Sequence, residues 1–160
     1  MVEKTKSNWL IKLFILLYIL FLLFIITNFR IIRVSGISMK PTLDVDDLLL
    51  VFKYPKRYIP KPKHGMIVSF KSPSNPNHNY VKRIIGLPED EIRIEDGRVF
   101  LNGAELKEDY IKEDSITSPG YWDSEWTVLE GHVFVLGDNR QAGGSSDSRS
   151  FGYIKISDII

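Results

Sequence analysis

The feature that most constrains this chain is a long apolar run close to its start. The run "WLIKLFILLYILFLLFIITNF", Trp9 to Phe29, contains a single charged residue, Lys12, near one end where the side chain can reach lipid headgroups. A helix of this length spans roughly 30 Å, which matches the hydrocarbon thickness of a bilayer. A cleaved secretory signal would have an apolar core of about 7–15 residues followed by a pair of small residues. No such pair follows Phe29, so we expect a retained membrane anchor.

The anchor divides the 160 residues into a short tail (1–8), the anchor (9–29) and one domain (30–160) large enough for a single core. The chain has 21 basic and 20 acidic residues and a net charge of +1, which gives no case for nucleic acid as a partner. The absence of cysteine excludes disulfides, cysteine-ligated metals and a thiol nucleophile. Basic residues flank the anchor almost equally on both sides, so charge bias leaves the orientation in the membrane open.

Short apolar or alternating runs after the anchor predict a mainly β domain. We expect a buried strand in Asp47–Tyr54, further strands in Gly65–Phe70 and His132–Gly137, and a hairpin in Glu91–Gly103 that turns at Asp96-Gly97. The proline-rich and basic stretch Lys53–Gly65 indicates a solvated loop or a contact with anionic headgroups. No long stretch after Phe29 keeps a helical period, so we predict a compact antiparallel β barrel or sandwich.

Two serines and a proline follow the anchor in "VSGISMKPTL", Val34 to Leu43, and Ser38 is the candidate nucleophile. A serine hydroxyl needs a base at neutral pH. The three histidines (His64, His78 and His132) stand at no recognisable catalytic or metal-binding spacing and are interpreted as ordinary surface or edge residues.

Lys82 in "YVKRIIGLP" is the candidate base, because Ser-Lys pairs are a known variant of the serine triad. A free lysine has a pKa near ~10.4, and burial among apolar groups can lower it to about 7–8. The alternative is an edge-strand lysine that points into water.

A third stretch, "GDNRQAGGSSDSRSFG", gathers charged residues in a loop rich in glycine and serine between Gly137 and Gly152. It is either a polar turn with exposed ion pairs of little energetic value, or a scaffold for the base. As a scaffold, Asp147 pairs with Arg140 or Arg149, and a nearby serine hydrogen-bonds the lysine.

Together the anchor and these stretches resemble the bacterial type I signal peptidases, which are membrane-bound Ser-Lys enzymes. Within that family the chain resembles the small Gram-positive-like type. "SGISMKPTL" is similar to the family's nucleophile box, "DDLLLV" to the strand box after it, "YVKRIIGLP" to the lysine box and "GDNR…SSDSRSFG" to the last box. The resemblance covers most of the chain from Arg33 to Gly152.

The resemblance implies that Ser38 is the nucleophile, Lys82 the general base and Met39 a residue that shapes the site. Some family members place a serine donor two residues before the nucleophile. Here Gly36 stands there, so the oxyanion hole relies on backbone N–H groups. In the last box the resemblance makes Ser145 the partner of the lysine and assigns the supporting charges to Asp138, Arg140, Asp147 and Arg149.

The sequence departs from the family pattern at four places. Asp46 and Glu89 stand where glycine is common, Met66 stands where aspartate is common, and "QAGG" lengthens the spacing between Arg140 and Ser145. The resemblance implies no metal and no cofactor. It implies preproteins with small residues at the cleavage site as substrates, the bilayer as a partner, and a catalytic domain on the extracytoplasmic side of a single-pass anchor.

Two other functions stay open from the sequence. One is a non-catalytic anchored β module in surface or pilus assembly, which would need neither Ser38 nor Lys82. The other is the self-cleaving domain of SOS repressors, which shares a similar serine stretch but carries a DNA-binding module in front. This chain has an anchor there.

Overall fold

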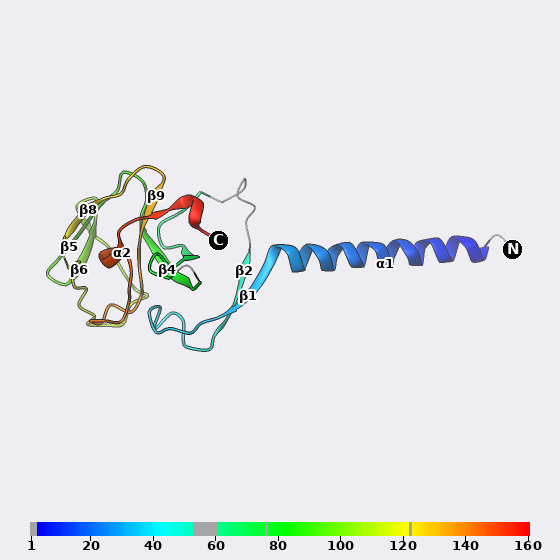
Figure 1. Ribbon diagram of the computed structural model, residues 1–160, viewed down its shortest axis with the longest axis horizontal. Coiled ribbons are helices and arrows are strands. Elements are labelled where there is room, and N and C mark those ends of the chain that lie inside the picture. The colour runs from blue at the N-terminus through cyan, green and yellow to red at the C-terminus, as the bar shows by residue number, and fades with distance from the viewer. Residues whose placement is uncertain (1–2, 53–60, 76, 122) are drawn as a thin grey trace.

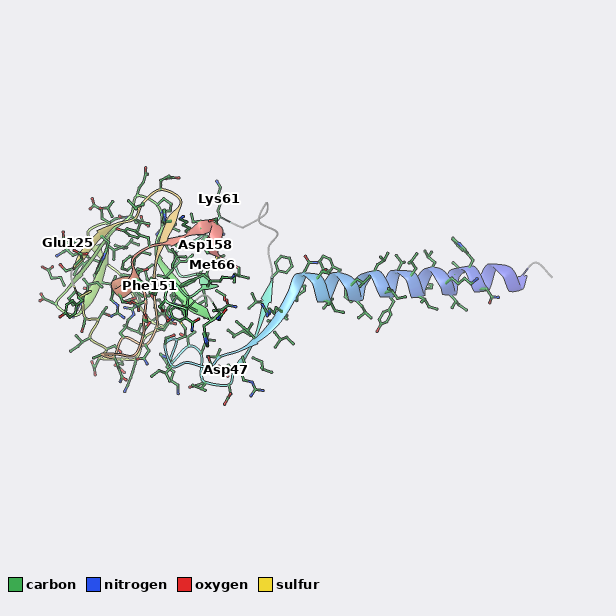
Figure 2. The ribbon with its side chains drawn as sticks, in the orientation of Figure 1. Asp47, Lys61, Met66, Glu125, Phe151 and Asp158 are labelled. Carbon is green, nitrogen blue, oxygen red and sulfur yellow. The ribbon has the colours of Figure 1, made fainter. Side chains whose placement is uncertain are left out.

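The computed structural model describes residues 3–52, 61–75, 77–121 and 123–160, so part of the predicted loop after Phe52 lies outside the described residues. Helix α1 (Glu3–Asn28) projects away from the β-rich body, with the N-terminus at its far end (Figure 1). Its stretch Asn8–Asn28 is long and apolar enough to cross a membrane. Its side chains extend outward all along the described length (Figure 2). The helix therefore begins before the predicted anchor and ends one residue earlier.

Strands β1 (Phe29–Arg33) and β2 (Leu48–Phe52) form a two-stranded antiparallel hairpin between α1 and the rest of the body (Figure 1). The prediction of a buried strand over Asp47–Tyr54 is wrong in its burial, because Leu48 and Leu50 are 66% and 67% exposed. This two-stranded sheet lies beside the helix, and only one face of the sheet is covered. Alternate side chains therefore face outward, and Ile31, opposite Leu50, is 67% exposed as well.

Two four-stranded antiparallel sheets make up the body and confirm the predicted mainly β fold. The first has the order β10-β9-β4-β3, with β3 at Ile67–Lys71, β4 at Asn79–Gly86, β9 at His132–Leu136 and β10 at Ile154–Lys155. The second has the order β7-β6-β5-β8, with β5 at Glu91–Glu95, β6 at Arg98–Leu101, β7 at Ala104–Glu105 and β8 at Glu125–Thr127. Glu125 lies at the end of the body away from α1 (Figure 2). A short helix α2 (Ser148–Phe151) and a 3-10 turn η2 (Ile156–Asp158) complete the chain.

The central strands β4 and β9 are buried on both faces. On one face Ile85, Phe134 and Leu136 pack against the second sheet. The other face carries Ile84, Val133 and Val135, and it is covered by partly buried residues that include Phe151, Ile156 and Ile159. A polar side chain on β4 is therefore held away from water unless it lies at the strand's open end.

Local turn chemistry places Asp96, Gly97, Asp46 and Glu89 in the left-handed region. At the predicted hairpin turn, Asp96 and Gly97 have φ angles of 49° and 79°, as a tight two-residue turn requires. Asp46 and Glu89 have φ angles of 73° and 72°. The resemblance implies glycine at both positions, and here each residue takes the left-handed conformation that glycine adopts most readily.

Candidate active site

Ser38 lies in the turn that follows β1, on a loop held by its own backbone hydrogen bonds. The N–H of Lys40 donates to the carbonyl of Ile37 at 3.1 Å, and the N–H of Leu43 donates to that of Met39 at 2.9 Å. Met39 is buried and anchors the loop in the body. The Ser38 side chain is left half-buried at the loop surface.

Lys82 lies on β4 opposite Val68 of β3 and is only 2% exposed. Its Nζ donates to Ser38 Oγ at 2.7 Å and to the carbonyl of Val81 at 3.0 Å. The amine also lies 5.0 Å from the centre of the Tyr80 ring. The predicted alternative of a lysine that points into water is wrong, because β4 is a central strand whose faces are covered.

Burial lowers the pKa of Lys82 to about 8, because an ammonium loses hydration inside the fold. The negative charge of Asp147 opposes this shift, with smaller contributions from Tyr80 and Asp138. An amine with this pKa is neutral in an appreciable fraction of molecules near neutral pH. A neutral amine at hydrogen-bond distance can accept the hydroxyl proton of Ser38.

Asp147 forms the ion pair with Arg149 that the resemblance implies. Its carboxylate caps α2 and accepts from Arg149 Nε and Nη2, both at 2.8 Å, and from the N–H of Gly137 at 3.1 Å. The side chain is 1% exposed, so the pair is a buried one. Of the two arginines that the sequence offered as its partner, Arg149 is the one bound.

Asp138 and Arg140 are both buried, but each has a partner from another part of the chain. Asp138 accepts from Arg83 Nε at 2.9 Å and Nη2 at 2.6 Å, and from the Thr42 hydroxyl. Asp138 therefore ties the strand of Lys82 to the loop of Ser38.

Arg140 binds residues of the connection between β7 and β8. It donates to Glu108 Oε2 at 2.9 Å and to the Thr117 hydroxyl at 3.0 Å, and its Nε donates to the carbonyl of Gly137 at 2.8 Å. Sequence reasoning missed Glu108, because its partner is 32 residues away and no local pattern marks it. Arg83 and Asn139 stand inside quoted boxes, yet no side-chain role was assigned to either.

Ser145 is brought to the nucleophile loop, but the predicted hydrogen bond to Lys82 is not formed. Its Oγ is buried without a partner in the described part of the chain. A Cβ added at Gly137 would lie 2.2 Å from this Oγ and 2.4 Å from the carbonyl oxygen of Ser38. Ser145 therefore packs behind Ser38 through Gly137, while the Lys82 amine is directed to Ser38 and to the Val81 carbonyl.

The two reacting groups open into a groove of about 620 Å³. Its lining combines apolar residues, among them Ile32, Val34, Leu43 and Val81, with polar residues, among them Ser72, Asn75, Asn77, His78 and Ser146. Gly36 lines this groove, and a Cβ there would meet nothing within 4 Å, so the backbone is open to an approaching chain. His78 also lines the groove, but among the described residues the hydroxyl of Ser38 has its hydrogen bond with Lys82.

A serine held by a buried lysine on an antiparallel β body, behind an apolar helix, defines the class of Ser-Lys sites. Comparison with known proteins agrees with this class: residues 7–160 match the family described as signal peptidase, peptidase S26. The chain belongs to the signal peptidase family.

Several relatives carry the name Signal peptidase I. One from Pseudomonas fluorescens is 33% identical over 82% of this chain, and Signal peptidase I P from Bacillus subtilis subsp. natto is 35% identical over 99% of it. The chain spans 59% of the length of the first relative and 88% of the second. A crystal structure of a signal peptidase I from Enterococcus faecalis matches with a TM-score of 0.53 and 34% identity, covering 64% of this chain and 96% of that one.

Proposed function

We propose that this protein is a membrane-anchored serine endopeptidase that removes signal peptides from exported preproteins. The observation that carries the proposal is the 2.7 Å contact between Lys82 Nζ and Ser38 Oγ, made by a buried amine. A membrane-anchored protein that only bound partners would gain nothing from burying a lysine, because burial disfavours the charged amine and lowers its pKa. Family membership supports the same conclusion.

In the proposed reaction, neutral Lys82 takes the proton of Ser38 while the serine oxygen attacks the scissile carbonyl. Backbone N–H groups beside Ser38 bind the oxyanion; one such donor is typically worth about 10²–10³ in rate. The leaving amine receives a proton from Lys82, and an acyl-enzyme remains. Lys82 then removes a proton from the water that hydrolyses the acyl-enzyme and frees the serine.

The groove supports binding of an extended cleavage region. Its apolar lining residues suit small or apolar side chains at alternate positions, while main-chain hydrogen bonds would give affinity. The β1–β2 hairpin lies between α1 and the rest of the body (Figure 1), and Ile32 and Arg33 of β1 line the groove, which keeps the groove close to the end of the anchor. We propose that the β body lies on the extracytoplasmic side, where the signal peptide's cleavage site emerges.

The test is cleavage of a preprotein by the detergent-solubilised full chain. Ser38→Ala and Lys82→Ala should each abolish processing, whereas Ser157→Ala and Lys155→Ala, at exposed sites on η2 and β10, should retain it. The rate should rise with pH through about 8, since the neutral form of Lys82 is the active base. Processing at the normal rate by either dyad variant would contradict the proposal and favour the non-catalytic alternative.

A further inference from the structure

We propose that Asn139 is a positioning residue that fixes the Ile37–Ser38 peptide, so that the N–H of Ser38 serves as the oxyanion donor. This inference rests on the proposed function. It concerns how the donor is aimed, which neither the dyad nor the ion pairs of the last box explain.

Asn139 holds both carbonyls next to the nucleophile. Its Nδ2 donates to the carbonyl oxygen of Ile37 at 3.1 Å, and its backbone N–H donates to the carbonyl oxygen of Ser38 at 3.0 Å. The side chain is only 9% exposed, so the amide is not exchanged for water. The loop of Ser38 is thus tied to the last box by two hydrogen bonds from one residue.

Peptide planarity converts this anchoring into an orientation of the N–H group. The Ile37–Ser38 bond is trans, so the carbonyl of Ile37 and the N–H of Ser38 lie in one rigid plane and point in opposite directions within it. Asn139 lines a pocket on the side of Lys40 and Pro41, whereas Ser38 lines the substrate groove. Holding the carbonyl toward Asn139 therefore turns the N–H away from it, toward the groove.

The N–H of Ser38 is available for this role. Within residues 3–52, 61–75, 77–121 and 123–160, no acceptor is bound to it. Gly36 supplies no hydroxyl donor. The orientation of the Ser38 N–H therefore matters more for binding the oxyanion than it would in a site with two donors.

The lengthened loop of this chain is built around the Asn139 amide. The N–H of Gln141 donates to Asn139 Oδ1 at 3.3 Å, and a Cβ added at Gly144 would lie 2.6 Å from Oδ1 and 2.9 Å from Nδ2. Gly144 has no positive φ angle, so the only obstacle to alanine there is this contact. The "QAGG" segment, whose length departs from the family pattern, thereby acquires a function.

Two variants test the inference by different routes. Asn139→Ala removes the donor to Ile37, and Gly144→Ala keeps the donor but displaces it. Each should lower kcat for preprotein cleavage by about 10- to 100-fold, less than the full loss of an oxyanion donor, because the N–H remains but is misaimed. KM should stay within about twofold, because strand pairing in the groove is unchanged. The matched control is Gln141→Ala, which removes an exposed side chain of the same loop and should keep kcat.

Three further readouts separate positioning from a structural role. A peptide aldehyde with the cleavage sequence forms a tetrahedral adduct with Ser38, so its affinity should fall by the same factor as kcat. The matching peptide alcohol forms no adduct and should bind as before. The apparent pKa of the rate should stay at its wild-type value in both variants.

Unchanged kcat in both variants would overturn the inference, as would a loss confined to KM and stability or a shifted apparent pKa. If the wild-type chain cleaves in a Ser38-dependent way and both variants are fully active, the inference is refuted but the proposed function is not. A wild-type chain without Ser38-dependent cleavage would refute the proposed function and the inference with it.

Discussion

At the scale of single residues, Lys82 is subject to opposing demands on its charge. Burial favours the neutral amine, whereas Asp147, Tyr80 and Asp138 favour the ammonium. The outcome is a pKa of about 8. In the proposed reaction, such an amine is neutral often enough to act as the base and charged often enough to protonate a leaving amine. The sequence could nominate Lys82 through its apolar neighbours, but its burial depends on pairing with Val68 and on covering segments far away in the chain.

A stability measurement over pH tests this picture directly. In the unfolded chain the amine has its ordinary pKa near ~10.4, and in the folded protein the pKa is about 8. The folded state therefore binds fewer protons between pH 8 and pH 10, and wild-type stability should rise with pH across that window. Lys82→Met lacks this dependence. The free energy of unfolding of Lys82→Met minus that of wild type should therefore fall by roughly 3 kcal/mol from pH 7 to pH 10.5.

Urea unfolding of both proteins at several pH values gives this difference. A difference that stays constant with pH would mean that the pKa of Lys82 is not lowered in the folded state. The same variant should be inactive at every pH.

Ser145 offers a second test at this scale. A buried hydroxyl without a partner among the described residues lowers stability, and this hydroxyl packs behind Ser38 through Gly137. Ser145→Ala should therefore leave the free energy of unfolding unchanged or higher by about 1 kcal/mol.

Ser148→Ala is the contrasting variant in the same loop. The Ser148 hydroxyl accepts from the N–H of Val135 at 2.9 Å, so its loss should cost about 1–3 kcal/mol of stability. Full activity of Ser145→Ala would leave Ser145 with a packing role only.

At the scale of elements, predictions that rest on local chemistry agree with the structure, and those that depend on context do not. The Asp96-Gly97 hairpin forms because both residues take positive φ angles readily. Strand β1 was missed because the apolar run of the anchor continues into Phe29, Ile31 and Ile32, and composition does not mark where a helix becomes a strand. Strands β7, β8 and β10 are too short to show a period.

The turn after β4 gives a prediction at this scale. Glu89 pays left-handed strain of roughly 1–2 kcal/mol, while its N–H donates to the carbonyl of Val128. Glu89→Gly relieves the strain. It also makes the unfolded chain more flexible, which lowers the free energy of unfolding by about 0.4–1 kcal/mol. We expect a net gain of roughly 0.5–1 kcal/mol in urea unfolding.

Glu89→Ala is the control for this turn, because it removes the same carboxylate but keeps the Cβ. It should bring no gain in stability. Equal stabilisation by alanine and glycine would assign the effect to the lost charge instead of the backbone.

At the scale of the whole molecule, the exposed apolar face of the β1–β2 hairpin continues the apolar surface of α1. Ile31, Leu48 and Leu50 are each about two-thirds exposed. They belong to β1 and β2, the strands that lie next to the end of α1 (Figure 1). Stretches of this kind mark an interaction surface, and its position supports contact with the bilayer. The contact would hold the groove close to the membrane.

Leu50→Glu should weaken this contact by roughly 1–2 kcal/mol, the value of most of a leucine side chain in an apolar phase. In vesicles, cleavage of a membrane-inserted preprotein should fall about tenfold, whereas cleavage of a soluble peptide should not change. Leu129→Glu, at another exposed leucine before β9, is the control and should affect neither substrate. A loss of peptide cleavage would point to a damaged groove.

The guanidinium of Arg140 sets a lower limit on how far such an enzyme can be reduced in size. It is fully enclosed, and its countercharge, Glu108, belongs to the connection between β7 and β8 of the second sheet. Deleting that sheet to obtain a minimal protease would leave the positive charge of Arg140 buried without a countercharge, next to the turn that carries Ser38. A shortened version would therefore need a neutral replacement for Arg140 before it could fold.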